Sequence, residues 1–138
     1  MTSSMPSHDE RGQSVSVFIV LIMTALIMTA GLVIDGGQKI TATSRAEAAA
    51  AGAARAAGNA AATQALAGSD AAGSAVIAAK SFLAGETGIS GTVSVSAGVV
   101  TVRTSSSAPT IFLSAVGIDA LTADGYAQAN IVATGETR

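Results

Sequence analysis

The uncharged apolar stretch from Gln13 to Ile34 limits what this chain can fold into more than any other part of the sequence. Its 22 residues, QSVSVFIVLIMTALIMTAGLVI, include no charged residue, proline or cysteine. Wound as an α-helix at about 1.5 Å per residue, they extend over roughly 33 Å, against a bilayer hydrocarbon thickness of about 30 Å. Charged residues flank the stretch, at positions 9–11 on one side and at Asp35 and Lys39 on the other. The stretch therefore predicts a transmembrane helix over residues 13–34.

Two other interpretations of this stretch fit less well. The buried core helix of a soluble domain is usually shorter and has a polar face, which this stretch lacks apart from Ser and Thr. A cleaved secretory signal has an apolar region of about 7–15 residues after a basic segment, whereas this stretch is longer and follows Asp9 and Glu10. Charge does not settle the orientation, since Arg11 before the stretch stands against Lys39 and Arg45 after it. By the positive-inside rule, that narrow margin places the N-terminus outside.

Composition restricts the remaining hundred or so residues to a small domain. The 138-residue chain is 49% hydrophobic but only 3% aromatic, so much of its apolar content is alanine, which buries little area per residue. A large ligand-enclosing core is not expected, and neither is a small-molecule substrate. The formal net charge of -2 offers no basic field for nucleic acid. With no cysteine and one histidine, we expect no disulfide, metal site or cofactor.

The two segments next to the apolar stretch differ in character. Residues 1–12 contain several serines and a proline without apolar periodicity, which predicts a disordered tail in which His8 has no role. After the stretch, Asp35 precedes Lys39 by four residues, a favourable helical pairing, so the helix is expected to continue through Gly36 and Gly37. Those glycines are also a possible flexible point.

The alanine-rich residues 38–67 contain no proline or turn cluster and favour helix throughout. We expect a helical stalk over residues 35–68 that packs closely against partner helices. A soluble alanine-rich spacer is the alternative. Within the span, Ala25 and Thr29 begin a stripe of small residues, which allows close helix approach in lipid but is also common in membrane helices generally. The candidate helix-packing or membrane-exit positions are Ala25, Thr29, Gly31, Asp35, Gly36, Gly37, Gly52 and Ala56.

Residues 69–138 predict a small α+β domain. Gly68 can end the long helix, and Ser69 or Asp70 can cap a second helix over residues 71–84. Alternating valines over residues 92–96 and 99–104 predict a β-hairpin.

The C-terminal part completes the predicted three-stranded antiparallel sheet. Pro109 can open a short helix at Thr110 that ends at Gly117, with the apolar residues between them buried, and residues 121–132 predict the third strand. The predicted core consists of Ile77, Phe82, Leu83, Val93, Val95, Val100, Val102, Phe112, Leu113 and Ile131.

Three segments resemble a known family: ERGQSVSVFIV at the start of the apolar stretch, GLVIDGGQKITATSRAEAAAAGAARAAG after it, and PTIFLSAVGIDALTADGYAQANIV near the C-terminus. They are similar to the TadE/TadG-like proteins of Tad (Flp) pilus loci, particularly the short actinobacterial forms. The most specific part runs from Gly31 to Arg45. The resemblance implies a cytoplasmic N-terminus, one membrane helix and an extracytoplasmic domain. It also implies a pseudopilin-like or assembly role, with membrane lipid and other pilus or secretion-system membrane proteins as partners.

One feature departs from the pilin pattern. Pseudopilins that prepilin peptidase processes have a glutamate five residues after the glycine at the cleavage site, whereas Gly12 is followed at that spacing by Val17. We therefore favour an anchored TadG-like accessory protein over a processed subunit. The residues do not assemble a catalytic motif, so no enzyme is expected. The alternative function is a membrane-anchored surface binding module, an adhesin or sensor. Leu at Gly52 or Ala56 should then be tolerated, whereas changes near Arg103 or Tyr126 should abolish function.

Overall fold

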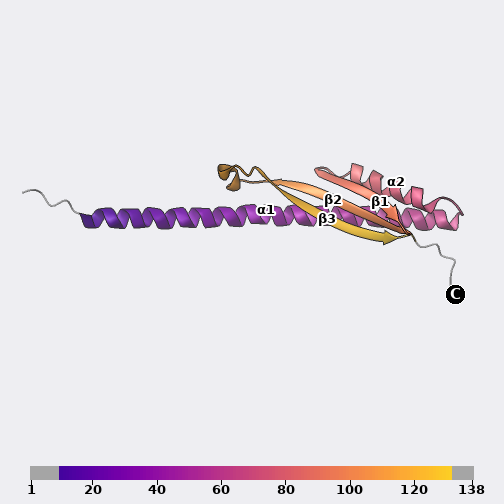
Figure 1. The fold of residues 1–138 in the computed structure, drawn as a ribbon, viewed down its shortest axis with the longest axis horizontal. Helices are drawn as coiled ribbons and strands as arrows, with labels where there is room; N and C mark the ends of the chain where they lie inside the picture. The colour runs from indigo at the N-terminus through magenta and orange to yellow at the C-terminus, as the bar shows by residue number, and fades with distance from the viewer. Residues whose placement is uncertain (1–9, 132–138) are drawn as a thin grey trace, which may run out of the picture.

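A computed structural model describes residues 10–131, with side chains from residue 14 onward, and its central element is one long helix. Helix α1 spans Glu10–Leu66, 57 residues or about 85 Å, and runs through Gly36 and Gly37 without a break (Figure 1). No proline falls within it. Most of the predicted N-terminal tail, residues 1–9 with His8, lies outside the described residues, whereas residues 10–12 already belong to α1.

The remaining elements follow α1 in the order predicted. They are α2 (Ala71–Ala84), β1 (Ile89–Ser96), β2 (Val99–Pro109), the 3₁₀ helix η1 (Leu113–Val116) and β3 (Ala120–Asn130). The α+β fold, with a long helix, a second helix and a three-stranded antiparallel sheet, is thereby confirmed. Asp70 caps α2 by accepting a hydrogen bond from the backbone N–H of Gly73 at 3.0 Å, and Gly68 adopts the left-handed φ of 68° before it.

The sheet is a simple antiparallel meander in the order β1-β2-β3. β1 and β2 form the predicted hairpin, in which Val95 pairs with Val100 and the chain turns at Ala97 and Gly98. Both strands extend beyond the predicted ranges, because β1 begins at Ile89 and β2 continues to Pro109. In the register of β2 with β3, Arg103 lies opposite Tyr126. The predicted end of the third strand, Val132, lies outside the described residues.

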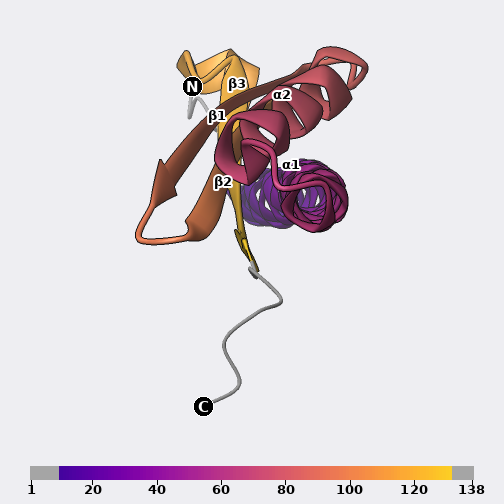
Figure 2. The ribbon, with the colours of Figure 1, turned by 90° about the vertical axis from the view of Figure 1, so that its right-hand side faces the viewer.

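Both helices pack on one face of the sheet and leave the other face open. Viewed along α1, helices α1 and α2 lie side by side against the same side of the three strands (Figure 2). The sheet and α2 cover only the C-terminal part of α1, while its N-terminal part extends alone (Figure 1). The molecule is therefore a small two-layer unit attached to a bare helix.

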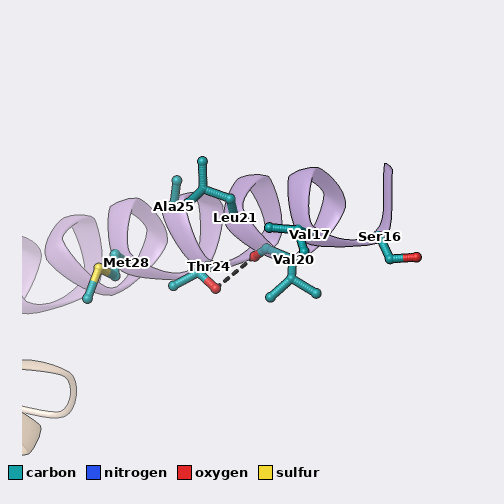
Figure 3. Close-up of a pocket in the computed structure, with 7 residues that line it drawn as sticks. All are labelled: Ser16, Val17, Val20, Leu21, Thr24, Ala25 and Met28. Atoms are coloured by element: carbon teal, nitrogen blue, oxygen red, sulfur yellow. Dashed lines mark hydrogen bonds between the residues drawn. The ribbon is translucent and has the colours of Figure 1, made fainter. Parts of the chain in front are cut away.

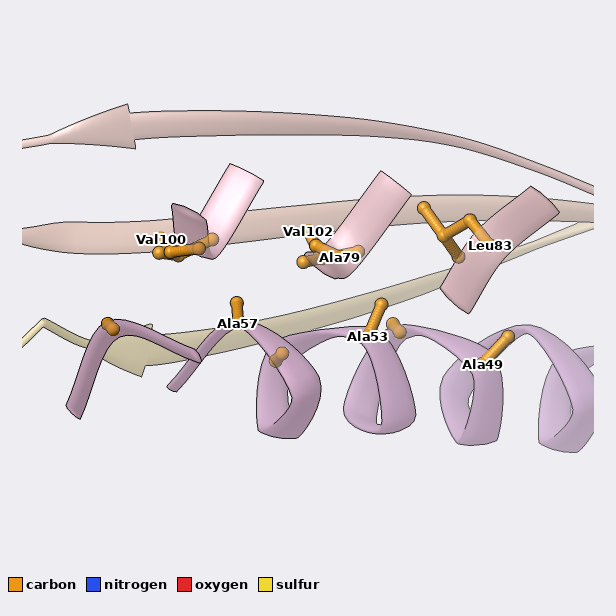
Figure 4. Packing of buried hydrophobic residues seen from close by; sticks show 11 residues of the cluster. Ala49, Ala53, Ala57, Ala79, Leu83, Val100 and Val102 are labelled. Atoms are coloured by element: carbon orange, nitrogen blue, oxygen red, sulfur yellow. The ribbon is translucent and has the colours of Figure 1, made fainter. Parts of the chain in front are cut away.

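The core is built from alanine. Ala50, Ala53 and Ala57 of α1 have no exposed surface, and they form one cluster with Ala75 and Ala79 of α2 and Val100 and Val102 of β2. Figure 4 shows Ala53 and Ala57 on the side of α1 that faces Ala79 and the two valines. Small side chains bring the helix backbones close to each other and to the sheet, which leaves no interior space for larger groups. The large fully buried apolar side chains are Val100 and Val102.

Several predicted core residues lie elsewhere. Val100, Val102 and Leu83 are buried as expected, but Ile77 is 70% exposed, Phe82 is 37% exposed and Phe112 is 38% exposed. The apolar residues predicted to be buried between Pro109 and Gly117 are also largely exposed, with Leu113 half-buried. These side chains are too large for the thin alanine layer and line its margins instead. Val93, Val95 and Ile131 are partly buried against the core.

The alanine-rich segment is an integral part of the folded unit. The buried alanines from Ala42 to Ala61 form one side of its core, so the helix predicted as a stalk over residues 35–68 packs against later segments of its own chain. The local pattern does not reveal this packing, because the sheet that covers the segment is formed by residues much later in the chain. The expected boundary between residues 68 and 69 lies between α1 and α2, whose alanines share one core cluster.

Candidate functional site at the exit of the apolar helix

The loop between β2 and β3 folds back onto α1 where the apolar stretch ends. Its two ends are held together by a hydrogen bond from the Thr110 N–H to the Asp119 carbonyl at 3.0 Å, and the Thr110 hydroxyl donates to the Ile118 carbonyl. Within the loop, Gly117 closes η1 in a left-handed conformation with φ of 88°. The loop is thus internally braced and presents the start of η1 to the helix.

The carboxylate of Asp35 holds this loop. It has no exposed surface, and it accepts backbone hydrogen bonds from Ile111 at 2.8 Å, Phe112 at 3.0 Å and Leu113 at 2.7 Å. These three N–H groups precede or open η1 and have no partner within it. One carboxylate therefore satisfies three backbone donors that come from a segment 76 to 78 residues later in the chain. Its partner is this loop, whereas the sequence spacing pairs it with Lys39.

The hydrogen bonds also set the charge state of this carboxyl group. The Ile111 N–H lowers the pKa of Asp35 below its ordinary value of 3.8, burial raises it, and the N–H groups of Leu113 and Phe112 lower it further, for a net decrease. Asp35 is accordingly ionised at neutral pH. A buried carboxylate is tolerated here because its hydrogen-bonding capacity is used.

Gly31 completes the contact one helical turn earlier. It is buried beneath Phe112, and a Cβ atom at this position would lie 2.7 Å from the Phe112 Cβ and closer still to the ring. Gly31 and Asp35 are four residues apart and share one face of α1. We refer to Gly31, Asp35 and residues 111–113 as the exit junction.

The other candidate positions separate into two groups. Ala25 and Thr29 are exposed and bond to each other within the helix, the Thr29 hydroxyl donating to the Ala25 carbonyl at 2.8 Å. Gly36 and Gly37 are exposed as well, and no atom lies within 4 Å of a Cβ at either position.

Gly52 and Ala56 lie inside the folded unit. Gly52 is buried against the ring of Phe82 from α2, and Ala56 is half-buried. Their small size therefore serves packing within the chain. Of the predicted site residues, Gly31 and Asp35 are the two that contact the β2–β3 loop, at the exit junction.

A second close approach, between strands β2 and β3 and helix α1, is not predicted from the sequence. The Thr104 hydroxyl, buried on β2, donates to the Ala46 carbonyl at 2.6 Å, and a Cβ on Gly125 would lie 2.6 Å from the Glu47 nitrogen. Here the sheet meets the helix backbone directly. A glycine inside a strand, at Gly125, is the sequence signal that indicates such a contact.

The bare part of α1 has a shallow groove on its surface. Figure 3 shows a shallow groove between Val17, Leu21 and Met28, in which the Thr24 hydroxyl donates to the Val20 carbonyl at 2.8 Å. All its lining residues belong to this one helix. Such a groove can accommodate lipid chains or a neighbouring helix.

The open face of the sheet is polar. Its one aromatic contact within residues 10–131 is the Arg103 guanidinium over the Tyr126 ring, 5.1 Å from the centroid. Among the described residues, no three His, Cys, Asp or Glu side chains are placed to hold a metal ion. Comparisons of the chain with protein-family models, with curated proteins and with solved structures find no match.

Proposed function

We propose that this protein is a single-pass membrane protein of the TadE/TadG-like kind, with a non-enzymatic, pseudopilin-like or accessory role. It would serve the assembly of a Tad (Flp) pilus or a related type IV pilus-like secretion machine. Its N-terminus would be cytoplasmic and its folded unit extracytoplasmic. The observation that carries the proposal is the bare apolar part of α1.

The large apolar side chains of this part remain exposed in the folded molecule. From Val15 to Ile34, the large apolar side chains are exposed by between 41% (Ile22) and 70% (Val33). The core helix of a soluble domain would bury them. Within the described residues, α1 is the one helix long and apolar enough to cross a membrane. A bilayer supplies the apolar surroundings that this surface requires.

The exit junction supports the TadE/TadG-like part of the proposal. The most specific segment of the resemblance, Gly31 to Arg45, includes both helix residues that hold the β2–β3 loop. This segment would therefore join the span rigidly to the folded unit. Because α1 is unbroken, a displacement of the span is transmitted directly to the sheet.

An anchored accessory protein is favoured over a processed subunit. Val17 occupies the position where processed pilins have glutamate, and its side chain is 64% exposed on the bare helix. Without that carboxylate, the span lacks the charge expected for packing into a pilin-type filament. The protein would instead remain in the membrane and contact other assembly proteins through the helix.

The test is protease accessibility of a C-terminal tag on intact cells, with the mass of the recovered protein measured in the same sample. We expect the tag to be digested and the protein to retain residues 1–12. A protected tag would overturn the proposed topology. Loss of the residues up to Gly12 would contradict the anchored accessory role and support a processed subunit.

A further inference from the structure

The β2–β3 loop carries exposed apolar side chains beside the end of the apolar stretch. Ile111 is 59% exposed, Val116 is 70% exposed and Ile118 is 45% exposed. The 15 residues from Thr104 to Ile118 include no charge. Loops that face water are ordinarily polar, and an exposed apolar cluster indicates a contact surface.

The exit junction fixes the depth of this loop relative to the span. Phe112 packs on Gly31, which precedes the last residue of the apolar stretch, Ile34, by three positions, or about 4.5 Å along the axis. The stretch is centred near residues 23–24, so Gly31 lies about 11 Å from its middle, inside a hydrocarbon half-thickness of about 15 Å. A helix that spans the bilayer therefore holds η1 at the hydrocarbon boundary. Figure 1 shows η1 beyond the ends of the strands, alongside α1.

The polar groups that join the loop to α1 at this depth are satisfied. The Asp35 carboxylate and the N–H groups of residues 111–113 bond to one another, so neither the charge nor the donors require water. Unsatisfied backbone groups would make insertion costly. Lys39 lies one turn farther along α1, and its exposed ammonium is placed at the level of the lipid phosphates.

We propose that residues 111–118 insert into the bilayer interface as a second membrane contact beside the span. The lipid acyl chains at the headgroup boundary cover Ile111, Val116 and Ile118. This inference rests on the proposed membrane anchoring. With contacts on the helix axis and to one side of it, the bilayer restricts the tilt of the folded unit, so the sheet and α2 keep a constant height above the membrane.

The chain contains no tryptophan, so one introduced tryptophan reports its own environment. Val116→Trp and Ile111→Trp place the reporter on the loop at exposed positions. Ile77→Trp is the matched control, because Ile77 is 70% exposed, as is Val116, but lies on α2. Leu26→Trp places a reporter in the middle of the bare helix. Each full-length variant is reconstituted in phosphatidylcholine vesicles with or without bromine on the acyl chains.

We expect the brominated lipid to reduce the emission of the Val116→Trp and Ile111→Trp variants about twofold or more, with a blue-shifted maximum. The Ile77→Trp variant should keep the emission of exposed tryptophan. Quenching of Leu26→Trp without quenching of either loop variant would overturn this inference and leave the anchoring intact. Absence of quenching at Leu26→Trp would overturn the proposed anchoring as well.

Discussion

The glycines of α1 differ in whether a side chain could be accommodated at their position. Gly31 lies against Phe112, and Gly52 against Phe82, so a methyl group at either position collides with a ring. Gly36 and Gly37 have open space where a side chain would be. Glycine is therefore required for packing at Gly31 and Gly52. At Gly36 and Gly37 it lowers helix stability without a packing role.

A pair of alanine substitutions tests this distinction. Gly37→Ala should stabilise the protein by up to about 1 kcal/mol, because alanine favours helix and meets no neighbour. Gly31→Ala should destabilise it by about 1–3 kcal/mol, because Phe112 has to move from the helix surface. Thermal unfolding in detergent micelles measures both. Equal effects of the two substitutions would contradict the assigned contact at Gly31.

Asp35 gives the protein a pH dependence whose sign follows from its lowered pKa. The carboxyl group binds protons more weakly in the folded state than in the unfolded state. Its contribution to stability is therefore present above its ordinary pKa of 3.8 and is lost as the pH falls from there through the lowered value. Asp35→Asn should lower the unfolding temperature at pH 7 and flatten this acid dependence, because an amide offers one oxygen where two accept now.

Asp124→Asn is the control, since it removes an exposed carboxylate from the open face of the sheet. Hydrogen exchange of the amides of residues 111–113 should accelerate in the Asp35 variant alone. An Asp35→Asn protein with unchanged exchange and unchanged acid unfolding would refute the clamping role.

Helix α1 combines two kinds of surface in one element. Its N-terminal part carries large exposed apolar side chains, and its C-terminal part carries the buried alanines that face the sheet. The apolar part needs lipid or other helices around it, and the alanine part needs the close backbone approach that the sheet makes at Gly125. The two parts of α1 therefore require different surroundings.

An arginine in the middle of the bare part tests its need for lipid. Leu26 is 60% exposed, and Leu26→Arg should make insertion less favourable by about 3 kcal/mol on translocon-based scales. The protein should shift from the membrane fraction to the soluble or aggregated fraction of fractionated cells. Leu66→Arg, at an 80% exposed position at the other end of α1, should remain in the membrane. Full membrane retention of both variants would contradict a span over residues 13–34.

The whole molecule presents two surfaces to partners: the bare helix with its exit, and the open face of the sheet. Leu at Gly52, which the sequence suggests as a way to separate an assembly role from a binding role, tests internal packing instead, because Phe82 occupies that space. Exposed positions separate the two roles better. Gly37→Leu alters the helix surface without a collision, whereas Arg103→Ala and Tyr126→Ala alter the open face.

For an assembly protein we expect Gly37→Leu to reduce fibre formation on cells, and Arg103→Ala with Tyr126→Ala to leave it near the wild-type level. Thermal unfolding of both variants should stay close to that of the wild type. The reverse pattern, with fibres intact and surface binding lost in the Arg103 and Tyr126 variant, would favour the adhesin or sensor.

Local patterns were sufficient for the elements of this fold. High helix propensity and the absence of proline predict α1 as continuous, and alternating valines predict the hairpin. The odd-numbered residues of β3 from Ala123 to Ala129 face the helices, as the alternation of a strand requires. These features depend on residues within a few positions of one another, so they can be read along the chain.

The partners of those elements depend on packing between distant segments. Asp35 has its donors 76 to 78 residues away, and the alanines of α1 are buried by a sheet formed after residue 88. A pattern that ranks side chains by size predicts Ile77 and Phe112 as core, whereas close backbone approach buries alanine and leaves those side chains at the margin. The composition and periodicity of the chain account for its helices, strands and apolar span. The burial of the alanine layer and the clamped loop follow from the way those elements meet in space, because close packing depends on shape between segments that are far apart in the sequence.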